Sequence, residues 1–412
     1  MHLFTFCVIV SYCPTIEFVP PYPESTATTW EDALVELQET IIYELLHPFK
    51  TPDKSKFPAL SLFVAQTPAA DLRRFIDHPE GKVRHYALYA AMIRGLKDVD
   101  QLLLDALNDD APLKIALLPA RQMPLNQVVT RWILMRLIGT QLNTISVDHP
   151  GRLSAPRVNL IYQTALSDEN HPLFEPLLTE VPAPRRFAPM IRNLAEEGSQ
   201  AALIALARFR EADDADLIAA YVCGVQENTG ALEAAALFPH KRLRPSLEDV
   251  LLRSAAQTEE PGEQTALFQA LLGQEADWCE ATLVPFFGSL DPNNASHTKI
   301  LWNFWHVVSQ REDWVNRHQY LVRQIAMRHH IMDFGTFSLL AKKDPAFGLQ
   351  LCQTLLLESE RPIYPQKWTP LLLGRWLKAM GEAGHDVPSL EIIPTEAPVF
   401  VHPHIKESWY RR

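Results

Sequence analysis

Residues 71–122 decide the fold, and they read DLRRFIDHPEGKVRHYALYAAMIRGLKDVDQLLLDALNDDAPLKIALLPARQ. After a turn rich in helix breakers, apolar residues recur three and four positions apart and define one buried helix face, at Val83, Tyr86, Ala87, Ala90 and Ile93. Residues 97–100 interrupt this pattern. A second apolar set follows, at Leu102, Leu103, Ala106 and Leu107. The stretch therefore predicts two consecutive helical hairpins of a stacked repeat.

The end of this stretch predicts the start of another helix. Residues 108–112 place an Asp at a cap position, and Pro112 stands where a helix tolerates proline, in its first turn. Asp77 and Asp109 are 32 residues apart, a spacing within the period expected of helical repeats. Small alanines at residues 87–91 allow neighbouring helices to approach closely.

The segment Asp77-x5-Val83-Arg84-x2-Ala87 resembles the D-x-x-V-R-x-x-A core of HEAT repeats, in the short form of phycobilisome-lyase-like repeats. Its Asp stands three residues further from the Val than in that family. Residues 110–116 are a weaker copy with Lys in place of Arg, and residues 201–218 are a third. The resemblance implies an α-α superhelix, a HEAT-like solenoid of stacked helical hairpins. It also implies that the Asp and Arg tie each inter-helix turn to its neighbour, with structural residues at Asp77, Val83, Arg84, Ala87 and Asp110.

Composition supports an all-α chain. With 412 residues the protein exceeds what one compact core usually holds, so two globular domains or one elongated repeat array are expected. It contains 15 Gly but 32 Pro, which disfavours many tight β-turns and suits many short helices that begin at proline. No segment alternates with period two for long enough to predict a sheet.

The chain is expected to have three parts. They are an N-terminal extended arm (1–28), a HEAT-like repeat array (29–385, with a division into about 29–165 and 166–385 as one option) and an extended C-terminal tail (386–412). The apolar run at residues 3–10 is shorter than the roughly 20 residues of a membrane span. It also lacks a basic start and a cleavage site. We therefore expect a short strand, a packed arm or an extension from an upstream start codon rather than an export signal.

Cysteine and histidine patterns predict no metal site. The five cysteines are odd in number and widely scattered, at positions 7, 13, 223, 279 and 352. Free thiols in a reducing cytoplasm explain this pattern best. His402 and His404 near His385 have no further ligands at a recognisable spacing, so surface histidines are expected. Motifs for common hydrolases, NTPases and dinucleotide enzymes are missing. The sequence thus predicts no cofactor and offers no means of choosing catalytic residues.

The charge distribution leaves two interpretations open. The net charge of −11 disfavours nucleic acid and anionic membranes as partners. Residues 111–165, however, contain six basic residues and one acid, a charge of +5. These cations are either ordinary solvated side chains or a basic surface. The second option resembles the bacterial alkylpurine DNA glycosylases, which are built from HEAT-like repeats and bind DNA in a basic groove. The residues available for such a groove are Arg131, Trp132, Arg136 and Asp148.

A second constellation lies in residues 298–330, where three tryptophans fall within thirteen residues: Trp302, Trp305 and Trp314. They suit a stacking platform or a peptide anchor. The alternative is packing, because Trp302 and Trp305 share one helical face and such a stripe commonly packs against a neighbouring helix.

Taken together, these patterns favour a binding protein over an enzyme. We expect a cytoplasmic scaffold or adaptor that presents the concave surface of a solenoid to another protein. A bacterial immunity-type protein that masks a basic nuclease would suit the acidic charge. The candidate partner-binding residues are Arg121, Arg131, Trp132, Arg136, Trp302, Trp305 and Trp314.

Overall fold

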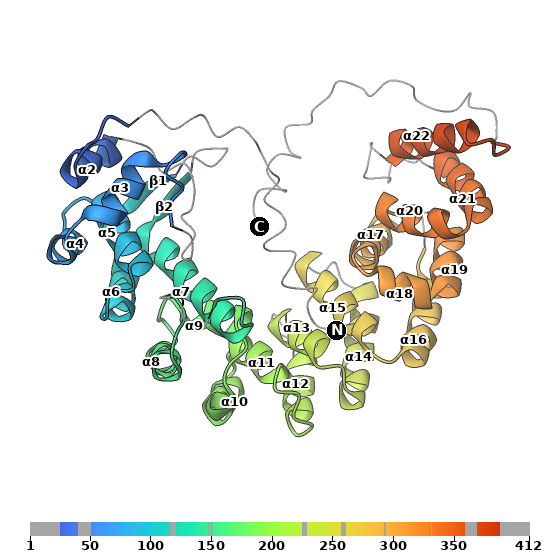
Figure 1. Cartoon of the computed structure of the whole chain (residues 1–412). Coiled ribbons are helices and arrows are strands. Elements are labelled where there is room, and N and C mark those ends of the chain that lie inside the picture. The colour runs from blue at the N-terminus through green and yellow to red at the C-terminus, as the bar shows by residue number, and fades with distance from the viewer. Residues whose placement is uncertain are drawn as a thin grey trace. The chain divides into compact units, whose positions relative to one another are not determined.

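The computed structural model describes residues 25–39, 51–115, 121–146, 149, 151–224, 229–256, 261–291, 294–330, 332–358 and 369–387. These residues form α-helices, short 3-10 turns and one β-hairpin, which confirms the predicted all-α fold (Figure 1). Contacts divide the chain into unit 1, residues 1–184, and unit 2, residues 185–412. The sequence had suggested a division near residue 165. Most of the expected N-terminal arm and C-terminal tail lies outside the described residues.

Unit 1 is organised around helix α5. Its helices are α2 (Trp30–Glu39), α3 (Pro58–Gln66), α4 (Ala69–Ile76), α5 (Gly81–Ile93), α6 (Val99–Asp105), the 3-10 turn η1 (Ala106–Asn108), α7 (Leu125–Gln141), α8 (Ala155–Leu166) and α9 (Phe174–Glu180). Helix α5 packs against α2, α3, α4 and α6. Val83 and all of residues 85–92 are buried, so the helix is covered on more sides than the single predicted face. Gly81 is required at its start, because a Cβ there would come within 2.6 Å of the Ala111 Cβ.

A β-hairpin follows η1, where the sequence pattern had predicted a helix. Strand β1 (Pro112–Ile115) pairs antiparallel with β2 (Arg121–Pro124), with Leu113 opposite Met123. Both strands contain proline, which removes amide donors and pushes the preceding residue towards extended backbone. Leu113 is buried and Lys114 exposed, as the period of two requires. The helix prediction at Pro112 was therefore wrong, since proline suits a strand end as well as a helix start.

Unit 2 contains two rows of stacked helices (Figure 1). The first row is α11 (Gln200–Ala207), α13 (Thr229–Leu237), α15 (Pro261–Gly273), α17 (Ala295–Ser309), α20 (Phe334–Lys343) and α22 (Thr369–Glu382). The second row is α12 (Asp214–Val222), α14 (Arg244–Ala256), α16 (Ala276–Ser289), α19 (Gln319–His329) and α21 (Pro345–Glu358). Each helix packs on the next one of its own row. The unit is completed by η2 (Arg185–Phe187), α10 (Ala188–Glu196), η3 (Lys241–Leu243) and α18 (Glu312–Arg317).

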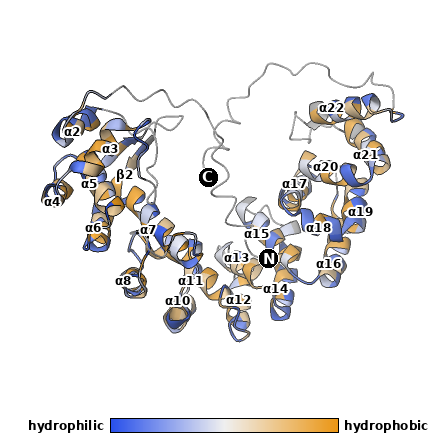
Figure 2. Cartoon of the chain, in the orientation of Figure 1, coloured by the Kyte–Doolittle hydropathy of each residue, from blue (hydrophilic) through white to orange (hydrophobic). Residues whose placement is uncertain are grey.

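The first row repeats regularly along the chain. Its helices begin at residues 200, 229, 261, 295, 334 and 369, so the interval is 29 to 39 residues, as expected of helical repeats. Side-chain caps begin three of these helices: Ser199 accepts from the Ala202 amide, Asn294 from the Ser296 and His297 amides, and Asp333 from the Thr336 amide. Figure 2 shows hydrophobic residues concentrated where the helices of a unit pack together.

Arginine side chains tie successive turns together. In unit 1 the Arg84 guanidinium contacts Asp109 through two bonds of 2.5 and 2.8 Å and donates to the carbonyls of His78 and Pro79. The turn before α5 is thus joined to the turn before β1. Arg84 performs the tie that the HEAT resemblance implied, but its partner is Asp109. Asp77 and Asp110, which the resemblance had placed in this role, are exposed.

The same kind of tie recurs in unit 2. The Arg192 guanidinium on α10 contacts Asp214 at 2.7 Å and Glu211 at 2.8 Å, and these two carboxylates raise the pKa of Arg192. Arg242 of η3 contacts Asp216 at 2.8 Å. The bonds to Asp214 and Asp216 span 22 and 26 residues of sequence and link one helical repeat to the next. Within the described parts of the chain, no helix is long and apolar enough to cross a bilayer.

Replacement of Arg84 by alanine is expected to lower the free energy of unfolding by about 2 kcal/mol, because it leaves the half-buried Asp109 carboxylate and two turn carbonyls without their donor. Asp77→Ala is the matched control, and a change of less than about 0.5 kcal/mol is expected for this exposed residue. Urea denaturation of both variants makes the comparison. Equal destabilisation would show that Asp77 does carry the structural role implied by the HEAT pattern.

Candidate functional site

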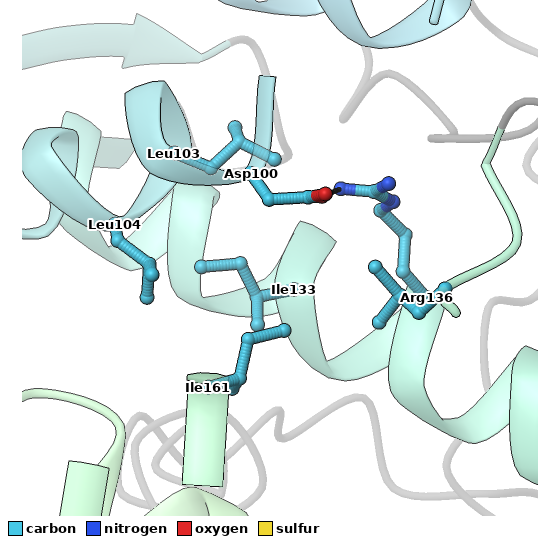
Figure 3. Close-up of a pocket in the computed structure, with 7 residues that line it drawn as sticks. Asp100, Leu103, Leu104, Ile133, Arg136 and Ile161 are labelled. Atoms are coloured by element: carbon cyan, nitrogen blue, oxygen red, sulfur yellow. Dashed lines mark hydrogen bonds and ion pairs between the residues drawn. The ribbon is translucent and has the colours of Figure 1, made fainter. Parts of the chain in front are cut away.

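A buried cluster of charged side chains is the most distinctive polar feature of unit 1 (Figure 3). Asp100, near the start of α6, contacts Arg136 of α7, with 2.5 Å between Oδ1 and Nη1. Its other oxygen, Oδ2, lies 2.9 Å from Nε of Arg157 on α8. Arg136 also donates from Nε to the Gly151 carbonyl at 3.1 Å. One carboxylate thus joins three consecutive helices of the unit.

The surroundings of this cluster are apolar and closed. Asp100 is 7% and Arg136 1% exposed, and the nearby apolar side chains are Leu103, Leu104, Ile133, Leu153 and Ile161 (Figure 3). The space between them does not admit a water molecule. Burial lowers the pKa of the Arg136 guanidinium from its ordinary value, while the adjacent Asp100 carboxylate acts in the opposite direction. The cluster is therefore built as an internal clamp and has no room for a small ligand.

Trp132 lies in the core of unit 1 and is not a surface contact. It is 1% exposed, and its ring stacks on His85 of α5 with 5.1 Å between the ring centroids. Tyr86 covers another side of the imidazole at 5.3 Å. His85 is fully buried and neither ring nitrogen has a hydrogen-bond partner. Desolvation lowers the pKa of His85 to about 3, so the imidazole is neutral in the folded protein.

Of the three tryptophans in residues 298–330, two are buried in the core and one is partly exposed. Trp305 on α17 is 0% and Trp314 on α18 is 1% exposed, and both pack against Phe304, at 4.9 and 6.3 Å between ring centroids. Trp302 is half-buried. The packing interpretation therefore holds for Trp305 and Trp314, because both are buried where α17 and α18 pack together.

Trp314 also forms part of a buried polar arrangement. Its ring stacks on His318 with 4.4 Å between centroids, and His318 Nδ1 lies 2.6 Å from Glu280 Oε1 of α16. His318 is 3% exposed, whereas Glu280 is half-buried. His318 lies between α18 and α19, so this contact joins their connection to α16. It gives the histidine a structural partner.

Three cations of the basic segment are occupied by contacts within unit 1. Arg136 and Arg157 are paired with Asp100, and Arg152 donates to the Ile145 carbonyl at 2.8 Å. Arg131 is exposed on α7. Arg121 belongs to β2, and its side chain and residue 148 lie outside the described parts. Partner binding by Trp132, Arg136, Trp305 and Trp314 is thus contradicted by their burial, while Arg131 and Trp302 remain accessible.

Thiols and metal ligands are not arranged for chemistry in the residues that the structure describes. Cys279 and Cys352 are buried, and burial raises the pKa of each thiol to about 12, which disfavours the reactive thiolate. Cys223 is exposed. Among the described residues, no group of three or more His, Cys, Asp or Glu side chains lies close enough together to hold a metal ion.

One feature of the surface of unit 2 was missed by sequence reasoning. Its exposed large apolar side chains are Met190 on α10, Leu252 on α14, Val284 on α16 and Tyr320 on α19. Within the described residues, none belongs to the first row. The sequence contains no signal for this distribution, because Leu252 and Val284 lie in apolar helices where only packing decides which side chain is covered.

Comparisons with known proteins leave the family of this chain open. No family model matches the sequence, and no curated protein is similar to it. Among solved structures, the chain is similar to a crystal structure of an engineered protein from a structural genomics consortium. The two share 14% identity over 87% of this chain and 90% of the other, with a TM-score of 0.25.

Asp100→Ala is expected to destabilise unit 1 by about 3 kcal/mol or more, because the buried Arg136 guanidinium would lose its counter-charge. Arg131→Ala, at an exposed position of the helix α7 that carries Arg136, is the matched control and is expected to change stability by less than about 0.5 kcal/mol. Chemical denaturation followed by circular dichroism measures both. A loss below 1 kcal/mol for Asp100→Ala would contradict the clamp role.

The neutral His85 predicts an acid-sensitive fold. Since its folded pKa is lowered to about 3 from an unfolded value of 6.5, its contribution is fully present above pH 6.5 and is lost as the pH falls towards 3. Between pH 7 and pH 4.5 the wild type is expected to lose about 2–3 kcal/mol more stability than His85→Phe. Urea denaturation across this range tests the difference. Parallel pH profiles for the two proteins would show that His85 is not buried and neutral.

Proposed function

We propose that the protein is a non-catalytic scaffold or adaptor that binds another protein through the surface of its stacked helices. The observation that carries this proposal is the double row of helices in unit 2, which places side chains from successive helices side by side on one face. Surface residues on such rows vary without disturbing the core, and recognition of a macromolecule is the usual function of this architecture. The step from architecture to function is an analogy between folds.

The buried and ion-paired side chains support a non-catalytic role because they hold the fold together. Asp100 and Arg136 close a buried clamp, and Arg84 and Arg192 connect successive turns. The net charge of −11 favours a basic partner, as it would in an immunity-type protein that masks a basic nuclease. The partner proposed here is accordingly a protein with a basic surface.

The DNA glycosylase alternative is less well supported by the side chains. Its suggested groove used Trp132 and Arg136, which are both in the core of unit 1. Of the residues suggested for that groove, Arg131 is exposed. Counterion release requires a row of cations on one face, and Arg157 is already paired with Asp100.

A pull-down with the tagged full-length protein from a lysate, with and without nuclease treatment, tests the proposed function. We expect one stoichiometric protein that is retained after nuclease treatment and is released as salt rises, because the attraction between the acidic chain and a basic partner is screened. Recovery of nucleic acid instead of protein would contradict the proposal and favour the DNA-binding alternative.

A further inference from the structure

Two adjacent helices of the second row present an acidic surface with an apolar centre. We call it the α14–α16 face, and it is defined by the exposed residues Glu248, Asp249 and Leu252 of α14 and Asp277, Ala281, Val284 and Pro285 of α16. Helices α14 and α16 are in contact within unit 2. The face is therefore a continuous part of the second row.

The register of the two helices is set by polar contacts. Arg244 contacts Glu275 at 2.6 Å and lies over the Trp278 ring. Glu248, one turn further along α14, accepts hydrogen bonds from Trp278 Nε1 at 2.9 Å and Thr282 Oγ1 at 3.4 Å. Early residues of α14 thus meet early residues of α16, so the two helices run in the same direction.

This register brings the apolar residues to the same end of the face. Leu252 follows Glu248 by one turn, and Val284 and Pro285 follow Thr282 on α16. Leu252 and Val284 are each the ninth residue of their helix. Leu252 is 68% and Val284 45% exposed, although both are large aliphatic side chains. The exposed Ala281 and Pro285 of α16 add to the apolar surface at this level of the face, which is suited to contact one apolar ridge of a partner.

Pro285 adds a hydrogen-bond acceptor to this centre. It lies inside α16 and has no amide N–H, so the carbonyl of Ala281 lacks its usual helical donor. Ala281 is an exposed residue and precedes Val284 and Pro285 by about one helical turn. A partner that carries N–H donors would satisfy this carbonyl.

The charge of the face is acidic. Helix α16 contains Asp277 and Glu280 but no Lys or Arg. The cations of α14 already have partners: Arg244 contacts Glu275, and Arg253 lies 3.2 Å from Asp249. An apolar centre with an acidic border is complementary to an apolar ridge with cations on both sides.

We propose that the α14–α16 face binds a basic amphipathic helix of another protein. The partner helix places apolar side chains with a spacing of three and four against Leu252 and Val284, and its Lys or Arg residues contact Asp277, Glu248 and the Ala281 carbonyl. This is the binding of a helix to a hydrophobic groove, with charge setting the specificity. The inference rests on the proposed scaffold function and specifies its surface and its class of partner.

A labelled synthetic helix of leucine and lysine, about four turns long, is the first probe. Fluorescence anisotropy is expected to show saturable binding to the wild type that weakens as salt rises. The double variant Leu252→Ser/Val284→Ser is expected to bind the helix at least about tenfold more weakly. The matched control is Met190→Ser on α10, since Met190 is 44% exposed and lies outside the second row. A leucine and glutamate helix of the same pattern is expected to bind at least about tenfold more weakly. Thermal unfolding by circular dichroism shows whether each variant is folded.

Equal binding of the lysine helix to the wild type and the folded double variant, or no binding at all, would overturn the inference. The pull-down is repeated with the same variants. This repeat distinguishes a failure of the α14–α16 inference from a failure of the proposed scaffold function. If the double variant captures the stoichiometric partner as well as the wild type, the α14–α16 face is wrong and the scaffold function stands. If no form captures a protein, the scaffold function fails, and the peptide measurements alone decide what the face binds.

Discussion

The structure depends on one constraint, which is that a helix without a polar side must be covered by its neighbours. Helix α11 reads QAALIALA, and every residue after Gln200 is buried. Such a helix is stable in water only when other helices pack around it. In unit 2, α10, α12 and α13 supply this cover. The stacking of rows is the direct consequence, because each repeat buries apolar surface that it cannot cover alone.

Small residues make this stacking close. A Cβ on Gly230 of α13 would come within 2.7 Å of the Gln200 Cβ on α11, so the two helices approach at a distance that a larger residue would prevent. Ala-rich sequences in both helices extend this close contact. Dense packing leaves few places for polar side chains, and those that are buried must find charged or hydrogen-bonding partners.

Two buried polar groups of the fold meet this requirement, and His85 is an exception to it. Asp100 is shared by Arg136 and Arg157, and His318 is held by Glu280. His85 instead stays uncharged between aromatic rings. Because these groups are occupied inside the fold, the proposed binding of a partner is assigned to the surface of the rows. The α14–α16 face is the place where exposed apolar side chains, an unusual proline and negative charge coincide.

The sequence by itself determined the helices and their approximate ends. The spacing of three and four around Val83 predicted α5, because helix formation follows local periodicity and breakers. It also indicated a repeat and the tie made by Arg84. Only the tertiary structure decided that Asp109 is its partner, that residues 112–124 form a hairpin and that Trp132 and Arg136 are buried. These outcomes depend on which surfaces meet in space, and local sequence patterns do not contain that information.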